Sequence, residues 1–476
     1  MPLPLSTAAR NGNIDVVRHL LNHGANVDDT DNNGLTALMH ASSMNFVALV
    51  ELLVKAGANV NLADIHGYSP LFHAAMADST AVVKWLVETG GANVDQVNNN
   101  GFTALSVSSE SGRAEVVKLL LAKGANVDRA NKEGSTPLNM SCIYGHQAVV
   151  KLLLAGGSKV DQANDAGDTP LFTSSGNGHQ EVVKLLLAKG AKVNQASKDG
   201  CTPLLMSSYG GHPEVVKLLL AKGAKVDQAD NDGDTPLYMS SQDGHTEVVK
   251  LLLSNGAEVD HANNEGATPL FVSSSRGHHE VVKLLLANGA AVNQANNKDV
   301  TPLLSGSASG HREVVKLLLA SGAAVDKAED DGWTPLIGSS ASGHYEVVKL
   351  LLAKGASVDL ASNDGVTSLF VSSMRGHEEV VKLLLANGAD VYQAAKDGNT
   401  PLVASRLNGH QEVVKLLMAR IATIRRFTVL SAIRQVRLVP PTPPPSQLLS
   451  ILANRTPDDV VRVILEFLGA QLELCG

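Results

Sequence analysis

The sequence contains few aromatic residues and few cysteines. Phe, Trp and Tyr make up only 3% of its 476 residues, which is too few for several large globular cores, so smaller apolar residues must form the contacts. The cysteines Cys142, Cys201 and Cys475 lie far apart and show no CxxC spacing. This scatter argues against a disulfide-stapled secreted domain and against a zinc site.

The chain also lacks a basic surplus and a long apolar run. Its formal net charge is −8, whereas a surface that binds nucleic acid is normally basic. Its first residues, MPLPLSTAARNGN, show no basic region followed by an apolar stretch. No apolar run approaches the roughly 18 residues that a membrane span requires. We therefore expect an intracellular, cytoplasmic protein without a transmembrane segment that binds no nucleic acid.

An internal repeat of 33 residues dominates the chain. A Val-Val pair recurs in one register, beginning at Val116, Val149, Val182, Val215, Val248, Val281, Val314, Val347, Val380 and Val413. Earlier copies begin at Val16, Leu49 and Val82, with one inserted residue at Gly90-Gly91. A fixed period of this length is the signature of a repeat solenoid. The sequence therefore predicts about thirteen repeats over residues 1–420.

The repeat at residues 231–263 shows the local structure that each unit predicts. Its Asn-Asp-Gly start, residues 231–233, is turn chemistry suited to the tip of a hairpin-like finger loop. Thr235-Pro236 predicts the start of a short first helix, and Gly256 ends a second helix. Both helices are too short to be stable alone, so they must bury their apolar faces against neighbouring repeats.

These repeats resemble those of the ankyrin family over nearly nine-tenths of the chain. The matching motifs are Thr-Pro-Leu (as at 136–138), Gly-His-x-Glu-Val-Val-Lys-Leu-Leu-Leu, and Gly-Ala-x-Val followed by Asp or Asn. The family's usual His after Thr-Pro-Leu is replaced here, for example by Phe172, and its Ala-Ala is often Ser-Ser, as at Ser174-Ser175. The resemblance implies an all-α fold, an ankyrin-repeat solenoid of stacked helix pairs with finger loops.

Two repeated polar features receive structural interpretations. Equivalent atoms of stacked repeats lie about 8–10 Å apart, too far for neighbouring histidines to share a zinc ion whose ligands lie about 2 Å from the metal. We therefore expect structural hydrogen bonds from the nine loop histidines, His146, His179, His212, His245, His278, His311, His344, His377 and His410. The Glu181/Lys184 pair and its copies are expected on a solvated helix face.

No arrangement in the sequence suggests catalysis. Outside the repeat motifs, the sequence shows no nucleophile beside a base, no glycine loop that could hold a phosphate, and no metal-ligand spacing. We therefore expect a non-enzymatic protein with no catalytic residue, no metal and no cofactor.

The candidate binding residues lie where the repeats differ from one another. Two positions at each finger tip and two positions just before the Gly-His vary, and in ankyrin-like folds these positions line the concave face. Aromatic and Arg side chains, which dominate protein interfaces, occur among them. The candidates for partner contact are Tyr68, Phe102, Tyr144, Tyr209, Arg276, Trp333, Met374 and Arg375.

The C-terminal part departs from the repeat pattern. Five arginines and no acidic residue occur between Arg420 and Arg437, so residues 421–439 predict a basic helical extension or cap, with weak contact to a membrane surface as an alternative. Residues 440–446 form a proline-rich linker. Residues 447–476 contain a short helix that starts near Thr456.

The final helix has two resemblances that remain open. VVRVILEFLGA resembles the second-helix motif VVKLLLAKGA, which implies a cap on the repeat array. TPDDVVRVILEFL resembles the first helix of an F-box, a module that joins ubiquitin-ligase scaffolds.

The sequence thus predicts a monomeric, intracellular scaffold or adaptor that binds one or more partner proteins, whose identity the sequence does not give. Two alternatives remain: a substrate receptor of a ubiquitin ligase, and a membrane-peripheral adaptor that uses the basic segment 420–437.

Overall fold

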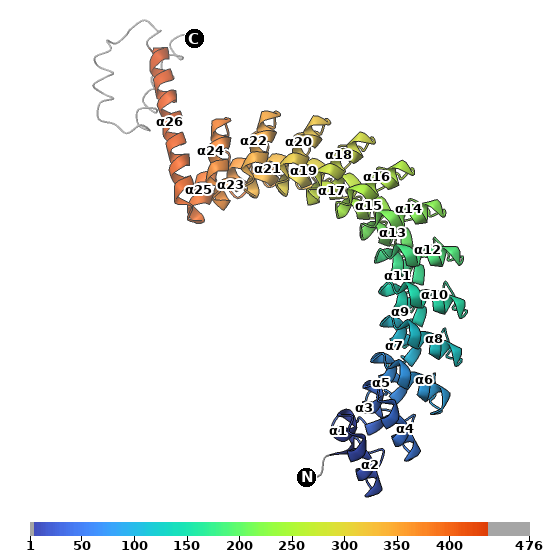
Figure 1. Ribbon diagram of the computed structural model, residues 1–476. Helices are drawn as coiled ribbons and strands as arrows, with labels where there is room; N and C mark the ends of the chain where they lie inside the picture. The colour runs from blue at the N-terminus through green and yellow to red at the C-terminus, as the bar shows by residue number, and fades with distance from the viewer. Residues whose placement is uncertain (1–3, 437–476) are drawn as a thin grey trace. The chain divides into compact units, whose positions relative to one another are not determined.

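The computed structural model describes residues 4–436, and this part of the chain consists of helix pairs joined by short loops (Figure 1). The predicted all-α repeat architecture is confirmed. Extended pairing in the described range is limited to two isolated bridges, Thr30 with Thr36 and Ala361 with Thr367. No helix in that range is both long enough and apolar enough to cross a membrane.

The described residues form two compact units. One contains residues 4–273 and 280–290, and the other contains 274–279 and 291–436. Within each unit, the first helices of the repeats form one row and the second helices form another (Figure 1).

The first helices carry odd numbers and span six to eight residues. They are α1 (Leu5–Arg10), α3 (Ala37–Ser43), α5 (Pro70–Met76), α7 (Ala104–Glu110), α9 (Pro137–Ile143), α11 (Pro170–Gly176), α13 (Pro203–Tyr209), α15 (Pro236–Gln242), α17 (Pro269–Arg276), α19 (Pro302–Ala308), α21 (Pro335–Ala341), α23 (Ser368–Arg375) and α25 (Pro401–Leu407).

The second helices carry even numbers and span nine residues, except for the last. They are α2 (Ile14–Asn22), α4 (Val47–Lys55), α6 (Thr80–Glu88), α8 (Ala114–Ala122), α10 (Gln147–Ala155), α12 (Gln180–Ala188), α14 (Pro213–Ala221), α16 (Thr246–Ser254), α18 (His279–Ala287), α20 (Arg312–Ala320), α22 (Tyr345–Ala353), α24 (Glu378–Ala386) and α26 (Gln411–Val436).

Helix starts follow the predicted capping chemistry. In α15 the Thr235 side chain accepts the backbone N–H of Tyr238 at 3.2 Å, and Pro236 occupies the first helical position. The hydroxyl satisfies an amide that has no partner within the helix, and proline loses nothing there because its position needs no N–H donor.

The core is built from a short apolar motif on each second helix. In α12 the side chains of Val182, Val183 and Leu186 are fully or almost fully buried. The Glu and Lys of the same helix, Glu181 and Lys184, form an exposed ion pair at 2.7 Å, which confirms the predicted solvated face. Since the helix is only nine residues long, burial against neighbouring helices must supply most of its stability.

The two serines of the Ser-Ser pair in α11 have different surroundings. Ser174 Oγ donates to the carbonyl of Pro170, four residues earlier in the same helix, at 2.8 Å. Ser175 is fully buried, and its hydroxyl has no hydrogen-bond partner. Other repeats place Ala75 or Cys142 in the register of Ser175, so this position selects for small size and not for a polar contact.

Asp or Asn after Gly-Ala-x-Val joins each repeat to the next. Asp128, Asp161 and Asn194 accept the backbone N–H of residues 159, 192 and 225 at 3.1, 2.9 and 2.9 Å. In the second unit, Asn293 and Asp326 do the same for residues 324 and 357. A residue that looks like a solvated loop acid in the sequence is therefore a link between repeats.

A second link, as predicted, comes from His146, His179, His212, His245, His311, His344 and His377. The Nε2–H of His212 donates to the carbonyl of Gly176 in the preceding repeat at 2.9 Å, and that of His344 donates to the carbonyl of Ala308 at 3.1 Å. The ring leaves no room for a side chain beneath it, because a Cβ on Gly178 would lie 2.5 Å from His212 Nδ1. Glycine is required here both for this contact and for its φ of +73°.

The last helix continues past the end of the repeat motif. Since α26 runs from Gln411 to Val436 without interruption, the predicted boundary at residue 420 falls inside one helix. The predicted linker at 440–446 and the predicted helix within 447–476 lie outside the described residues.

One finger carries a residue that its backbone disfavours. Asp299 adopts φ of +57°, where the other fingers of the two units place glycine. The backbone bond from this finger to the next, Asp330 N–H to Lys298 O, is 3.3 Å long, whereas equivalent bonds such as Asn363 N–H to Asp331 O measure 2.8–3.0 Å. A side chain in the left-handed region costs roughly 1 kcal/mol, somewhat less for Asp.

Asp299→Gly should stabilise this finger by about 0.5 kcal/mol, because the relief of strain exceeds the loss of an exposed ion pair with Lys327 at 3.5 Å. Hydrogen exchange of the Asp330 amide should slow. The converse change, Gly332→Asp, should speed exchange at Asn363, because a Cβ there would lie 2.7 Å from the Asn363 nitrogen. Faster exchange in Asp299→Gly would refute the strain argument.

Candidate functional site

In each unit, we call the variable positions of its repeats the finger face. It comprises the finger tips, such as 132–133, 231–232 and 330–331, and the C-terminal ends of the first helices, such as 143–144. Both residues of each finger tip are exposed from 65–66 to 396–397. Some tips also take part in the links between repeats: the side-chain amides of Asn99, Asn231 and Asn363 each donate to a tip carbonyl of the preceding repeat at 2.7–3.0 Å.

Three of the predicted contact residues extend into solvent from helix ends. Tyr144 follows α9 and is 54% exposed, and Tyr209 ends α13 and is 45% exposed. Arg276 ends α17 and is also exposed. Only the backbone of Tyr209 serves the framework, where its carbonyl accepts His245 Nε2–H at 2.8 Å. These side chains are therefore available to a partner.

Tyr68 and Phe102 are only half-buried, and each lies next to its own finger. The Tyr68 ring stacks on Phe72, with centroids 4.5 Å apart, and meets His73 edge-on at 5.8 Å. The backbone of Phe102 closes its finger turn with Asn98, through an N–H to Oδ1 bond of 2.9 Å. Part of each ring thus packs inside the protein, and the remainder faces outward.

Trp333 and Met374 are brought together by packing. Both lie against the buried cluster of Ile337, Ala341 and Val371, and both are half-buried. The contact shows that these two large side chains contribute to the core of the second unit as well as to its surface.

Arg375 is exposed at the end of α23, where it also has a structural bond. Its Nη1 donates to the carbonyl of Ala341 at 3.3 Å, and the same oxygen accepts His377 Nε2–H at 2.9 Å. Arg375 thus supplements the histidine link between two repeats.

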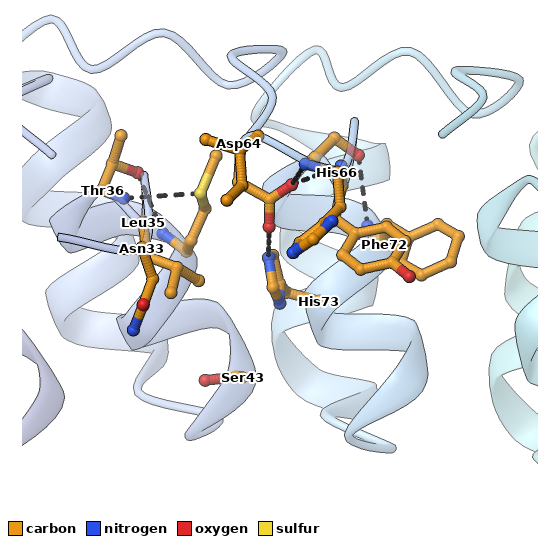
Figure 2. A network of polar contacts seen from close by, with 12 residues as sticks. Asn33, Leu35, Thr36, Ser43, Asp64, His66, Phe72 and His73 are labelled. Atoms are coloured by element: carbon orange, nitrogen blue, oxygen red, sulfur yellow. Dashed lines mark hydrogen bonds and ion pairs between the residues drawn. The ribbon is translucent and has the colours of Figure 1, made fainter. Parts of the chain in front are cut away.

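Sequence reasoning missed two buried histidine–aspartate pairs in the second and third repeats. His40 Nε2 lies 2.8 Å from Asp31 Oδ2. His73 Nε2 lies 3.0 Å from Asp64 Oδ2 (Figure 2). The other oxygen of Asp64 accepts two backbone N–H groups of its finger, those of residues 66 and 68. The signal in the sequence is an Asp nine residues before a His, repeated once at a spacing of 33 residues.

One member of each pair has a shifted pKa, His73 through burial and Asp31 through hydrogen bonds. Burial lowers the pKa of His73, which the Asp64 carboxylate only partly offsets and the neighbouring His40 reinforces. The neutral imidazole, donating its Nε2–H to Asp64, is therefore the stable form. For Asp31, burial acts to raise the pKa, but hydrogen bonds from His40 and from the backbone of Leu35 and Asn33 outweigh burial and lower the pKa.

The described residues offer no reactive thiol and no metal cluster. Cys142 is fully buried, which raises its pKa far above the usual range, and burial aided by Asp230 and Asp199 raises the pKa of Cys201 to about 11. Within residues 4–436, no three His, Cys, Asp or Glu side chains gather as metal ligands.

Comparison with known proteins identifies the repeat. The family model described as ankyrin repeats (three copies) matches residues 2–64, 61–131, 125–197, 190–263, 255–328, 295–362, 309–395 and 358–428. A search of curated proteins finds no match.

The His73–Asp64 pair should make the array sensitive to mild acid. An unfolded His has a pKa near 6.5, and the folded value is lower, so the stability that this group contributes is complete above about pH 6.5. It is lost as pH falls from there toward the folded pKa, because the unfolded chain takes up the proton first.

The double variant Asp64→Asn/His73→Met copies the residues of the fifth repeat, Asn131 and Met140. The urea concentration at the midpoint of unfolding should fall less in this variant than in the parent chain when the pH is lowered from about 7.5 to about 5.5. His66→Asn, at an exposed finger tip, serves as the control. Its urea midpoint should fall by as much as that of the parent chain over the same pH range. An unchanged drop in the double variant would contradict this role of His73.

Proposed function

This chain belongs to the ankyrin-repeat family, and on that premise we propose that it is a scaffold that holds one or more partner proteins against its finger face. Ankyrin repeats are generally modules of protein–protein interaction and are typically non-enzymatic. Binding then depends on the complementarity of many small contacts on a regular frame.

The observation that carries this proposal is the separation between framework and variable positions. The links between repeats use the His, the Asp or Asn, and the finger backbone, as in the bonds made by His212 and Asp161. The two residues at the end of the first helix differ between most repeats, as at 143–144, 209–210 and 275–276, whereas the exposed finger tips carry mainly Asn, Asp, Lys and Glu. A protein that needed only to stack its repeats would have no reason to vary these helix ends.

The eight proposed contact residues divide by their surroundings. Tyr144, Tyr209 and Arg276 are exposed anchors, and side chains of this kind dominate protein interfaces. Trp333 and Met374 also support a buried cluster, so their replacement would disturb the fold as well as the surface. Tyr144 and Tyr209 are therefore the positions at which binding can be tested without damage to the core.

Two narrower roles rest on the C-terminal part of the chain. In the first, an F-box-like segment from residue 456 recruits a ubiquitin ligase; failure of the full chain to retain any ligase subunit would discard this role. In the second, α26 contacts a membrane surface through Arg425 and Arg426 beside the exposed Phe427 and Leu430. Failure of the full chain to sediment with anionic vesicles would discard it.

Partner binding should depend on the tyrosines and not on the framework charges. The double variant Tyr144→Ala/Tyr209→Ala removes two anchors that are each worth about 1–4 kcal/mol in an interface, so partner proteins should be lost from affinity purifications of the full chain. Lys184→Gln/Lys217→Gln changes the exposed ion pairs of α12 and α14 instead and should retain the partners.

Both double variants should unfold at nearly the parent midpoint, because all four side chains are largely solvated. If the lysine variant loses the partners while the tyrosine variant keeps them, the partner does not bind at the finger face.

A further inference from the structure

The last repeat leaves framework residues more exposed than their counterparts in earlier repeats. The Leu of Thr-Pro-Leu is buried to 1% exposure or less at Leu171, Leu204 and Leu336, but its counterpart Leu402 is only half-buried. Met418, in the register of the third Leu of each second helix, is 49% exposed. The side of the thirteenth repeat that would face a fourteenth is therefore apolar and open.

A groove runs along this open side. It has a volume of about 920 Å³ and lies between α26, the loop before the last finger, and the start of α25. Its lining is mainly apolar, with two arginines on α26. The lining residues are Val391, Tyr392, Thr400, Leu402, Met418, Ile421, Ala422, Arg425, Arg426, Val429 and Leu430.

The sequence that follows α26 complements this groove. Residues 456–470 read TPDDVVRVILEFLGA. Their helical pattern places five apolar residues on one stripe, Val460, Val461, Ile464, Leu465 and Leu468. Two acids, Asp458 and Asp459, precede the stripe and match the sign of the groove's arginines.

We propose that segment 456–470 docks as an amphipathic helix in the α25–α26 groove and closes the end of the repeat array. Its apolar stripe covers Met418, Ile421 and Leu430, and its two acids lie near the arginines of α26. The segment takes the place that the second helix of a further repeat would occupy, which its likeness to VVKLLLAKGA also favours.

The connection is long enough for this docking. Nineteen residues, 437–455, join α26 to the segment and can span up to about 60 Å when extended, at about 3.3 Å per residue. The groove between Met418 and Leu430 follows about 18 Å of helix, at 1.5 Å per residue. The tether therefore reaches every part of the groove.

The tether also favours this occupant over a second copy of the chain. A segment tethered within reach of its own groove has an effective concentration there that does not depend on the concentration of other chains. A separate chain at micromolar concentration competes with it only if its contacts are far stronger.

A spin label on Cys475 tests the proposal in the full chain. Cys142→Ala and Cys201→Ser, which copy Ala75 and Ser135 of other repeats, leave Cys475 as the single thiol to label. The Met418 methyl resonance should then be broadened. Val461→Asp, on the apolar stripe, and Leu430→Asp, in the groove, should each restore it.

Val463→Asp is the matched control, because it makes the same change away from the stripe and should leave the broadening intact. An unbroadened Met418 signal in the labelled chain would overturn the proposal. So would equal broadening when the label and the observed methyl are on different chains in a mixed sample, because a second copy would then occupy the groove.

Discussion

Each repeat of this protein depends on its neighbour for burial and for hydrogen bonds. A nine-residue helix such as α12 is unstable alone, and its Val-Val-x-x-Leu face is buried only because other helices pack on it. Apolar packing has no preferred direction, whereas the hydrogen bond from His212 to the preceding repeat is directional. It also requires glycine beneath the ring, so a residue in one repeat restricts the sequence of the repeat before it.

The first repeats show this dependence where the pattern changes. The glycine before the second helix is replaced by Asn45 and Asp78 in the second and third repeats, both at positive φ. In each case the next repeat lacks the histidine and carries Ser79 or Arg113 instead. Where no histidine ring lies over this position, a side chain has room there. Asp78 occupies that room and pairs with Arg113 at 3.4 Å. The glycine and the histidine therefore change together because they occupy one contact.

Much of the fold could be predicted from the sequence because its physics is local and repeated. The 33-residue period, the Thr-Pro helix starts and the loop histidines each appear many times in the sequence. In the structure, the helix starts make the same capping bond in successive repeats, and most of the histidines make the same bond to the preceding repeat. The surroundings of particular variable residues could not be predicted. The sequence treats Trp333 and Tyr144 alike as variable positions, yet Trp333 packs on Ile337 and Val371 of two neighbouring repeats, while Tyr144 remains exposed. The Asp64–His73 pair was missed because it occurs in too few repeats to stand out as a pattern.

Hydrogen exchange on the variant His212→Ala tests the dependence between neighbours most directly. The variant removes the 2.9 Å bond to Gly176 and the ring that packs over Gly178, and Lys217→Gln on the solvated face of α14 is the control. Protection should fall in α11–α14, the helices of the two repeats that this histidine joins, and should remain in the other repeats of the same unit. Unchanged protection in α11–α14, or an equal loss throughout the unit, would contradict the account.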